Sequence, residues 1–181
     1  MAFPRRVVVI CTTVTHHIYI RVLLEVFRGS EIAIAAPMGM VPLLSDVLFQ
    51  KGWERVTFYP VWRNKSFSGP VRRLADGADI VVIDEMFALG DLAAFARWKT
   101  GPGCFLTVHN INSWFFPRWT FSPKKNLISL LRKIILHKMR NIVVVGSALK
   151  EHLDAKKVSK RVLHVPAVMA VRPVPDPSAS V

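Results

Sequence analysis

Two polar residues, His109 and Asn110, directly follow the strand-like run Cys104–Val108. A neutral imidazole can accept a proton from a hydroxyl group or donate a hydrogen bond to a phosphate, and its ordinary pKa lies near physiological pH. An asparagine amide can both donate and accept hydrogen bonds. The pair therefore indicates a site for a hydroxylated or phosphorylated ligand, the alternative being a structural histidine whose hydrogen bonds are satisfied within the fold.

A second polar pair, Asp84 and Glu85, closes the apolar run that begins at Asp79. A carboxylate at the end of a strand can orient a sugar hydroxyl or act as a base. Adjacent side chains of a strand point to opposite faces, so at most one of the two should face a ligand, and we assign that role to Glu85. The alternative is that the pair caps the following helix.

The segment 11–17 (CTTVTHH) offers hydroxyl groups and imidazoles close to the expected start of the first helix. Backbone amides at a helix N-terminus favour an anion, so Thr13, Thr15 and His16 are candidate ligands of substrate or donor phosphate. The segment has no glycine-rich fingerprint, which argues against an ordinary nicotinamide dehydrogenase. No P-loop, zinc-ligand spacing or serine-nucleophile elbow is present either, and we expect neither a metal nor a cofactor.

Short β-branched runs supply the strands that would position these groups. They are Arg6–Cys11, Glu31–Ala35, Arg55–Tyr59, Asp79–Asp84, Gly103–Val108, Asn141–Val145 and Arg161–Val165. Between them lie the expected helices Thr15–Phe27, Pro42–Lys51, Gly69–Ala75, Leu89–Lys99, Lys124–Met139 and Ala148–Lys156. This alternation predicts an α/β fold: a doubly wound, mostly parallel sheet of about seven strands with helices on both faces. Ligands bind such sheets beyond the carboxyl ends of the strands.

The composition fits one globular domain, since 51% of the 181 residues are hydrophobic and 20% are charged. We expect the domain to span residues 1–166 and the proline-rich remainder, 167–181, to form a tail or linker. No apolar run approaches the roughly 20 residues that a spanning helix needs. Cys11 and Cys104 lie in apolar runs, as expected of buried, reduced thiols in a cytoplasmic protein.

A formal net charge of +13 implies an anionic partner. The expected helix Lys124–Met139 has an apolar stripe formed by Leu127, Ile128, Leu131, Ile134, Ile135 and Met139. Its basic face and the aromatic segment before it suit an anionic membrane surface, the alternative being a helix that covers the sheet with a solvated outer face. Nucleic acid is not expected, because no nucleic-acid-binding motif is present. The candidate membrane-surface residues are Lys125, Arg132, Lys133, Arg140, Trp114 and Trp119.

Three segments, in this order, resemble the N-terminal half of family-4-type glycosyltransferases of the GT-B fold. They are Thr107–Asn110 (TVHN), Ser147–Leu153 (SALKEHL) and Val162–Pro166 (VLHVP), and with the strands the resemblance covers most of residues 6 to 166. It implies a single Rossmann-like half in which His109 lies near the scissile sugar–phosphate group, and Thr13 to His16 near the donor phosphates or the acceptor. It also implies a nucleotide-sugar donor, a glycan or lipid-linked acceptor, and transfer with retention of configuration.

The chain departs from the family pattern at Thr12–Thr15, which replace a glycine-rich loop, and at Ala167, where asparagine is often found. The donor domain would follow Val181, so we expect a truncated copy or a separate C-terminal partner chain. The resemblance thus predicts the acceptor-binding half of a hexosyltransferase-type enzyme of cell-envelope or polysaccharide synthesis, cytoplasmic and peripheral on the inner face of the membrane. The alternatives are a non-catalytic membrane-surface or protein-binding module and a nucleotide-binding enzyme of another Rossmann-like class.

Overall fold

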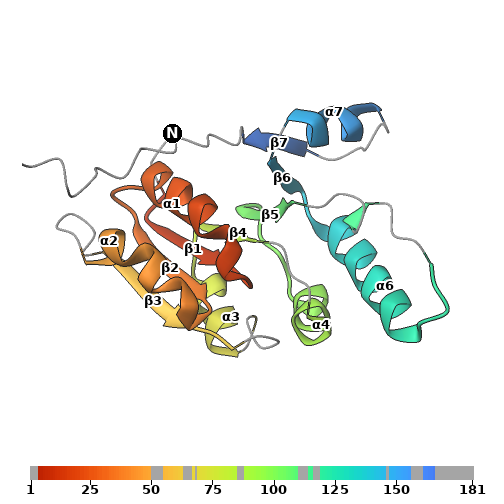
Figure 1. The fold of residues 1–181 in the computed structure, drawn as a ribbon, viewed down its shortest axis with the longest axis horizontal. Coiled ribbons are helices and arrows are strands. Elements are labelled where there is room, and N and C mark those ends of the chain that lie inside the picture. Colours follow the sequence, from red (N-terminus) through yellow and green to blue (C-terminus); the bar gives the residue numbers. More distant parts are fainter. Residues whose placement is uncertain are drawn as a thin grey trace, which may run out of the picture.

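The computed structural model describes residues 4–49, 55–62, 67, 69–84, 88–109, 114–115, 119–145, 147–155 and 161–165. Within them, strands form one sheet in the order β3-β2-β1-β4-β5-β6-β7, and all neighbouring strands are parallel. The strands are β1 (Arg6–Ile10), β2 (Glu31–Ala36), β3 (Val56–Pro60), β4 (Ile80–Ile83), β5 (Cys104–Val108), β6 (Asn141–Val145) and β7 (Arg161–Val165). The predicted doubly wound, Rossmann-like α/β fold is confirmed, and the strand order reverses between β1 and β4 (Figure 1).

Helices alternate with these strands along the chain (Figure 1). They are α1 (His17–Val26), α2 (Ser45–Leu48), α3 (Gly69–Asp76), α4 (Leu89–Arg97), α6 (Pro123–Lys138) and α7 (Ser147–Ala155), with the 3-10 turns η1 (Val14–His16), η2 (Met38–Met40) and η3 (Pro42–Leu44). None of the described helices is both long enough and apolar enough to cross a membrane.

The alternating side chains of β1 divide the core into two layers. Val7 and Val9 pack in a cluster with residues of α1, such as Ile20 and Leu24. The neighbours Val8 and Ile10 pack on the other face, in a cluster that includes residues of α3, α4 and α6. All four β1 valine and isoleucine side chains are fully buried, which is why this strand is continuously apolar.

The observed helices and strands differ from the predicted ones mainly at their first and last residues. β6 and β7 have the predicted bounds, and most other elements shift by one or two residues. The expected helix Pro42–Lys51 is divided into η3 and the short α2, with residues 50 and 51 outside the described part. α7 begins at Ser147, one residue before the expected start at Ala148. The predicted tail, 167–181, also lies outside the described residues, so the domain boundary remains a prediction.

The apolar stripe predicted for α6 is only partly buried. Ile135 and Met139 are buried as expected, but Leu127 and Ile134 are exposed. The buried face instead includes Arg132 and lies against α4. Apolar residues extend around much of this helix, so the sequence period alone does not determine which side packs inward.

Candidate active site at the carboxyl edge of the sheet

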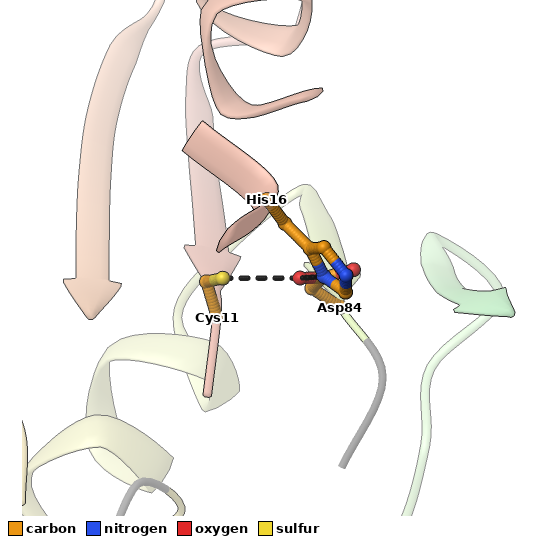
Figure 2. A group of neighbouring side chains, drawn as sticks. All are labelled: Cys11, His16 and Asp84. Carbon is orange, nitrogen blue, oxygen red and sulfur yellow. Dashed lines mark hydrogen bonds and ion pairs between the residues drawn. The ribbon is translucent and has the colours of Figure 1, made fainter. Parts of the chain in front are cut away.

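The side chain of Asp84 is fully buried directly after β4. Its Oδ2 lies 3.0 Å from the Sγ of Cys11 and 2.6 Å from the Nδ1 of His16. Its Oδ1 lies 2.8 Å from the Nε2 of His109. Figure 2 shows Cys11 and His16 converging on the carboxylate from two different segments. We call these four residues the Asp84 cluster.

The sheet order brings the cluster together. β4 pairs with β1 on one side and with β5 on the other, all three strands being parallel. Their carboxyl ends therefore meet at one edge, where Cys11 follows β1, Asp84 follows β4 and His109 follows β5. The Asp84 amide also donates a hydrogen bond to the Ile10 carbonyl oxygen at 2.7 Å, which continues the β1–β4 ladder to the site.

The turn η1 returns His16 to this edge. Thr13 has extended backbone angles and caps the turn, because its Oγ1 accepts a hydrogen bond from the Thr15 amide at 3.4 Å. The hydroxyl groups of Thr13 and Thr15 lie 2.9 Å apart and share a further hydrogen bond. A threonine at this position is a favoured N-cap, so the local sequence accounts for the path of the chain between Cys11 and His16.

Asp84 is an ionised hydrogen-bond acceptor. Burial raises the pKa of Asp84, but the hydrogen bonds from His109 and His16, the charge of His16 and the hydrogen bond from Cys11 outweigh burial and lower that pKa to about 2. An ionised carboxylate has no proton to donate, so the partner atoms on both histidines and on Cys11 are the donors. Burial, followed by the negative charge of Asp84, raises the pKa of the Cys11 thiol, which therefore stays protonated.

Aromatic contacts hold the two imidazoles against each other. The rings of His16 and His109 are stacked, with centroids 3.9 Å apart and planes inclined by 26°. Tyr19 of α1 lies edge-on to His109 at a centroid distance of 5.7 Å. Its hydroxyl group is 2.7 Å from the Thr107 hydroxyl, and burial raises the pKa of Tyr19 to about 12. His109 is therefore fixed by a carboxylate, a stacked ring and a neutral phenol.

A cavity of about 860 Å³ opens beside the segment that joins Cys11 to His16. Its walls include Thr12, Thr13 and Val14, the start of α4 at Leu89 and Gly90, and Lys124 and Ile128 of α6. Pockets of roughly 300–1,000 Å³ with a few polar groups are typical of small-molecule sites. Hydroxyl groups on one wall and a lysine on another suit a ligand that carries hydroxyl and anionic groups.

Cys11, His16 and Asp84 are also residue types that bind metal ions, and their ligand atoms lie within 4.8 Å of one another. Ligand atoms around a tetrahedral zinc ion are more than about 3 Å apart. The 2.6 Å and 3.0 Å contacts of Asp84 are instead hydrogen-bond distances. Because the thiolate is the metal-binding form of cysteine, the protonated Cys11 thiol also favours the hydrogen-bonded description.

Of the predicted site residues, His16 and His109 meet at Asp84, Thr13 lines the cavity, and Thr15 bonds to Thr13. Asn110 and Glu85 lie outside the described residues. The sequence pattern indicates Asp84 as an acidic residue of this edge, but the ligand was expected at Glu85. The contacts of Cys11, Tyr19 and Thr107 with the site were not expected from the sequence. The available signal is that Cys11 follows β1, Thr107 lies in β5 and Tyr19 lies in the first helix.

The candidate membrane-surface residues divide into two groups. Trp114 is fully buried. Arg132 is also buried, and its guanidinium carbon lies 5.2 Å from the centre of the Trp114 ring. Neither of these two residues lies at the surface as expected, because Trp114 is in the core and Arg132 is on the buried side of α6, against the Trp114 ring. Four others are exposed: Lys125, Lys133, Arg140 and Trp119.

A doubly wound parallel sheet with polar groups at its switch point defines a ligand-binding α/β domain. The family model described as Glycosyltransferase Family 4 matches residues 6–166, so the chain belongs to this family. Its function is accordingly that of a glycosyltransferase domain, and the family implies nucleotide-sugar and glycan substrates. The searches of curated proteins and of solved structures gave no match.

Proposed function

We propose that the chain is the acceptor-side domain of a glycosyltransferase that moves a sugar from a nucleotide-sugar donor to a glycan or lipid-linked intermediate of the cell envelope or of a polysaccharide. The observation that carries the proposal is the pair of histidines on the buried Asp84 at the sheet's switch point. The adjoining cavity, with its threonine hydroxyls and Lys124, suits a polar ligand. The donor half of the site belongs to a C-terminal domain or a partner chain, and no cofactor is required.

His109 is the proposed catalytic group. When the bond between the sugar and the nucleotide breaks, negative charge develops on the departing phosphate. A positioned hydrogen-bond donor stabilises that charge more in the transition state than in the bound substrate, which raises the rate. The hydrogen bond to Asp84 and the stacked ring of His16 limit the movement of the His109 imidazole, so little reorganisation is needed during transfer.

The test is sugar transfer by the complete assembly that contains this chain and its donor domain. Release of the nucleoside diphosphate and labelling of the acceptor are measured with wild-type protein, with His109→Ala and with the control His152→Ala on the exposed side of α7. His109→Ala should lower kcat about 100-fold or more, as removal of a transition-state donor does elsewhere, while the control stays near wild type. Equal rates for wild type and His109→Ala would contradict the proposed role.

We further propose that α6 rests on an anionic membrane surface on the cytoplasmic side. Leu127, Leu130 and Ile134, spaced along one side of α6, are 44%, 46% and 40% exposed. Trp119 and Phe121, just before the helix, are also exposed. Exposed apolar side chains at this spacing are characteristic of helices that lie in a membrane interface.

Basic residues border this apolar surface. Lys124, Lys125 and Lys133 are exposed, and the Lys133 ammonium lies 5.4 Å from the centre of the Trp119 ring. Together with the net charge of +13, they favour anionic over neutral lipid. Because Arg132 is buried, the charges that meet the lipid are those of the lysines rather than that of Arg132.

Vesicle sedimentation tests the membrane proposal. Binding to phosphatidylglycerol vesicles should exceed binding to phosphatidylcholine vesicles and should weaken as salt is added, since salt screens surface charges. The double variant Lys125→Gln/Lys133→Gln should weaken binding about 30-fold, from about 1 kcal/mol for each charge near the surface. The matched control is Arg72→Gln/Arg73→Gln on the exposed side of α3, which removes the same charge elsewhere. Equal losses for both double variants would contradict a specific contact through α6.

A further inference from the structure

The walls of the cavity carry one basic and one acidic side chain. Lys124, in the first turn of α6, lies on one wall, and Asp91, in the first turn of α4, lies on another. The two helices pack against each other (Figure 1). The other described lining residues are uncharged: Thr12, Thr13, Val14, Pro37, Ala88, Leu89, Gly90 and Ile128. A bound ligand therefore meets opposite charges on the α6 and α4 walls.

We propose that Lys124 determines which acceptor is bound, and that the ligand of this cavity is an anionic polyol. Such a ligand is a sugar or polyol that carries a phosphate or carboxylate group beside its hydroxyl groups. Its anionic group binds the Lys124 ammonium, and its hydroxyl groups face Thr12 and Thr13. The inference rests on the proposed glycosyltransferase function and names a class of acceptor that membership of the family leaves open.

The two helix starts differ in how they receive an anion. Backbone amides at the start of a helix attract negative charge, but Asp91 already places a carboxyl group in the first turn of α4. Its side chain is 2% exposed, and its Oδ1 accepts a hydrogen bond from the Phe67 amide at 2.9 Å. The first turn of α6 contains Lys124 and no acidic residue, and the Ser122 side chain makes no capping hydrogen bond there. An anionic group is therefore repelled at α4 and attracted at α6.

The wall that follows β1 suits the uncharged part of the ligand. Thr12 and Thr13 line the cavity, and a hydroxyl group can both donate and accept hydrogen bonds. The Thr13 hydroxyl is held by its hydrogen bond with the Thr15 hydroxyl at 2.9 Å. Val14 and Ile128 add apolar surface that can cover the carbon atoms of a sugar ring.

The anionic group at Lys124 is distinct from the departing phosphate of the donor. The proposed position of that phosphate is at His109, in the Asp84 cluster, and neither His109 nor His16 lines the cavity. A charge contact away from the reacting bond is equally strong before and during transfer. It therefore strengthens binding of the acceptor without accelerating the chemical step. Lys124 is a specificity residue rather than a catalytic one.

Calorimetric titration of the 181-residue chain tests the binding preference with glucose, inorganic phosphate and glucose 6-phosphate. Glucose 6-phosphate should bind at least about tenfold more tightly than either other probe, because it alone satisfies both kinds of wall. Lys124→Gln should remove most of this advantage, and Lys124→Arg, which keeps the charge, should retain it. The control Lys99→Gln removes an exposed charge outside the cavity wall and should also retain it. Equal wild-type binding of phosphate and glucose 6-phosphate, or equal losses in both glutamine variants, would overturn the proposal.

Asp91→Asn tests the orientation of the ligand. Asparagine keeps an oxygen that can accept the hydrogen bond of the Phe67 amide but loses the acidic group. Binding of glucose 6-phosphate should become about threefold tighter or more, the opposite of the effect of Lys124→Gln. Weaker binding by a folded Asp91→Asn protein would overturn the assigned orientation. If circular dichroism shows that this variant does not fold, the two Lys124 variants decide the proposal.

Transfer by the complete assembly identifies the source of the acceptor. UDP-glucose and GDP-mannose serve as labelled donors, and a cell-envelope extract is divided into lipid and water-soluble parts, each separated by anion exchange into anionic and neutral fractions. Label should enter an anionic fraction, and the lipid or soluble arm that receives it gives the source. Lys124→Gln should raise the KM for that fraction about tenfold with little change in kcat.

Two results of the transfer experiment would overturn the inference while leaving the glycosyltransferase function intact. One is label in the neutral fractions alone. The other is a higher KM for the nucleotide sugar, rather than for the acceptor, in Lys124→Gln, which would assign the lysine to the donor. Absence of transfer to every fraction by wild-type protein would instead contradict the proposed function, and the titration with glucose 6-phosphate then decides the specificity of the cavity by itself.

Discussion

The Asp84 carboxylate accepts a hydrogen bond from the Nδ1 of His16 at 2.6 Å, across 68 positions of the chain. The contact depends on the pairing of β1 with β4, because His16 follows the first of these strands and Asp84 the second. The same carboxylate holds His109 from β5. One buried charge thus fixes the relative positions of three strand ends, and changes at Asp84 should affect both stability and chemistry.

Replacing Asp84 by asparagine should lower the free energy of unfolding by roughly 2 kcal/mol at pH 7, the difference that a shift of the carboxyl pKa from 3.8 to about 2 represents. Since that pKa is lower in the folded state, the contribution is complete above about pH 4 to 5 and is lost as pH falls toward 2. Urea unfolding of both proteins at pH 7 and pH 3 measures the difference. It should be clearly smaller at pH 3, and an equal difference at both values would contradict the account.

The thiols of Cys11 and Cys104 should both resist alkylation by iodoacetamide in the folded protein, because burial raises their pKa values and the thiolate is the reactive form. Only the Cys11 thiol also faces the negative charge of Asp84. Asp84→Asn should therefore accelerate alkylation of Cys11 by about fivefold or more relative to Cys104. Mass spectrometry of the two peptides measures both rates, and an equal increase at both thiols would indicate general unfolding instead.

Gly103, immediately before β5, should not tolerate a side chain. A Cβ atom there would lie 2.0 Å from the Asp79 carbonyl oxygen, and the Gly103 carbonyl accepts a hydrogen bond from Val81 at 3.0 Å. Gly103→Ala should destabilise the protein by about 3 kcal/mol or more, since backbone must move. Gly101→Ala, with open space around the added carbon, should change stability by less than about 0.5 kcal/mol. Similar melting temperatures for the two variants would show that the backbone at the start of β5 can move aside at little cost in stability.

Two cation–aromatic contacts of α6 should differ in strength because one is buried. The Arg132 guanidinium carbon is 5.2 Å from the Trp114 ring centre in the interior, and the Lys133 ammonium is 5.4 Å from the Trp119 ring centre at the surface. Arg132→Ala should cost about 2 kcal/mol and Lys133→Ala less than about 0.5 kcal/mol, because such contacts are stronger when desolvated. Chemical denaturation measures both, and equal costs would contradict the burial argument.

The fold was largely predictable because fully buried parallel strands form continuous β-branched runs. β6 and β7 match their predicted bounds, and the regular alternation with helices indicated the doubly wound sheet. The orientation of α6 was not predictable, since apolar residues extend around much of the helix and contact with α4 determines which of them are buried. The aromatic residues before α6 fit both an exposed loop and a small core beneath it, and the sequence does not show that Trp114 is one of the buried ones.

The location of the site was predictable, but its central contacts were not. Strands that end in His109 and Asp84 indicated the carboxyl edge of the sheet, and His16 was a candidate from its place near the first helix. The strand order places β4 between β1 and β5, and no local sequence pattern encodes this order. The contacts of Cys11, His16 and His109 with one carboxylate depend on it. Alternation along a strand showed that at most one of two adjacent carboxylates could face a ligand, without showing which.

The most direct test of the central claim is the rate of sugar transfer by the complete assembly carrying Asp84→Asn, with Cys11→Ala as the matched control that removes a carboxylate contact but no imidazole. If Asp84 positions the reacting groups, Asp84→Asn should lower kcat about 100-fold with little change in the KM for the nucleotide sugar, and Cys11→Ala should lower it far less. A folded Asp84→Asn protein that transfers sugar within about twofold of the wild-type rate would contradict the claim.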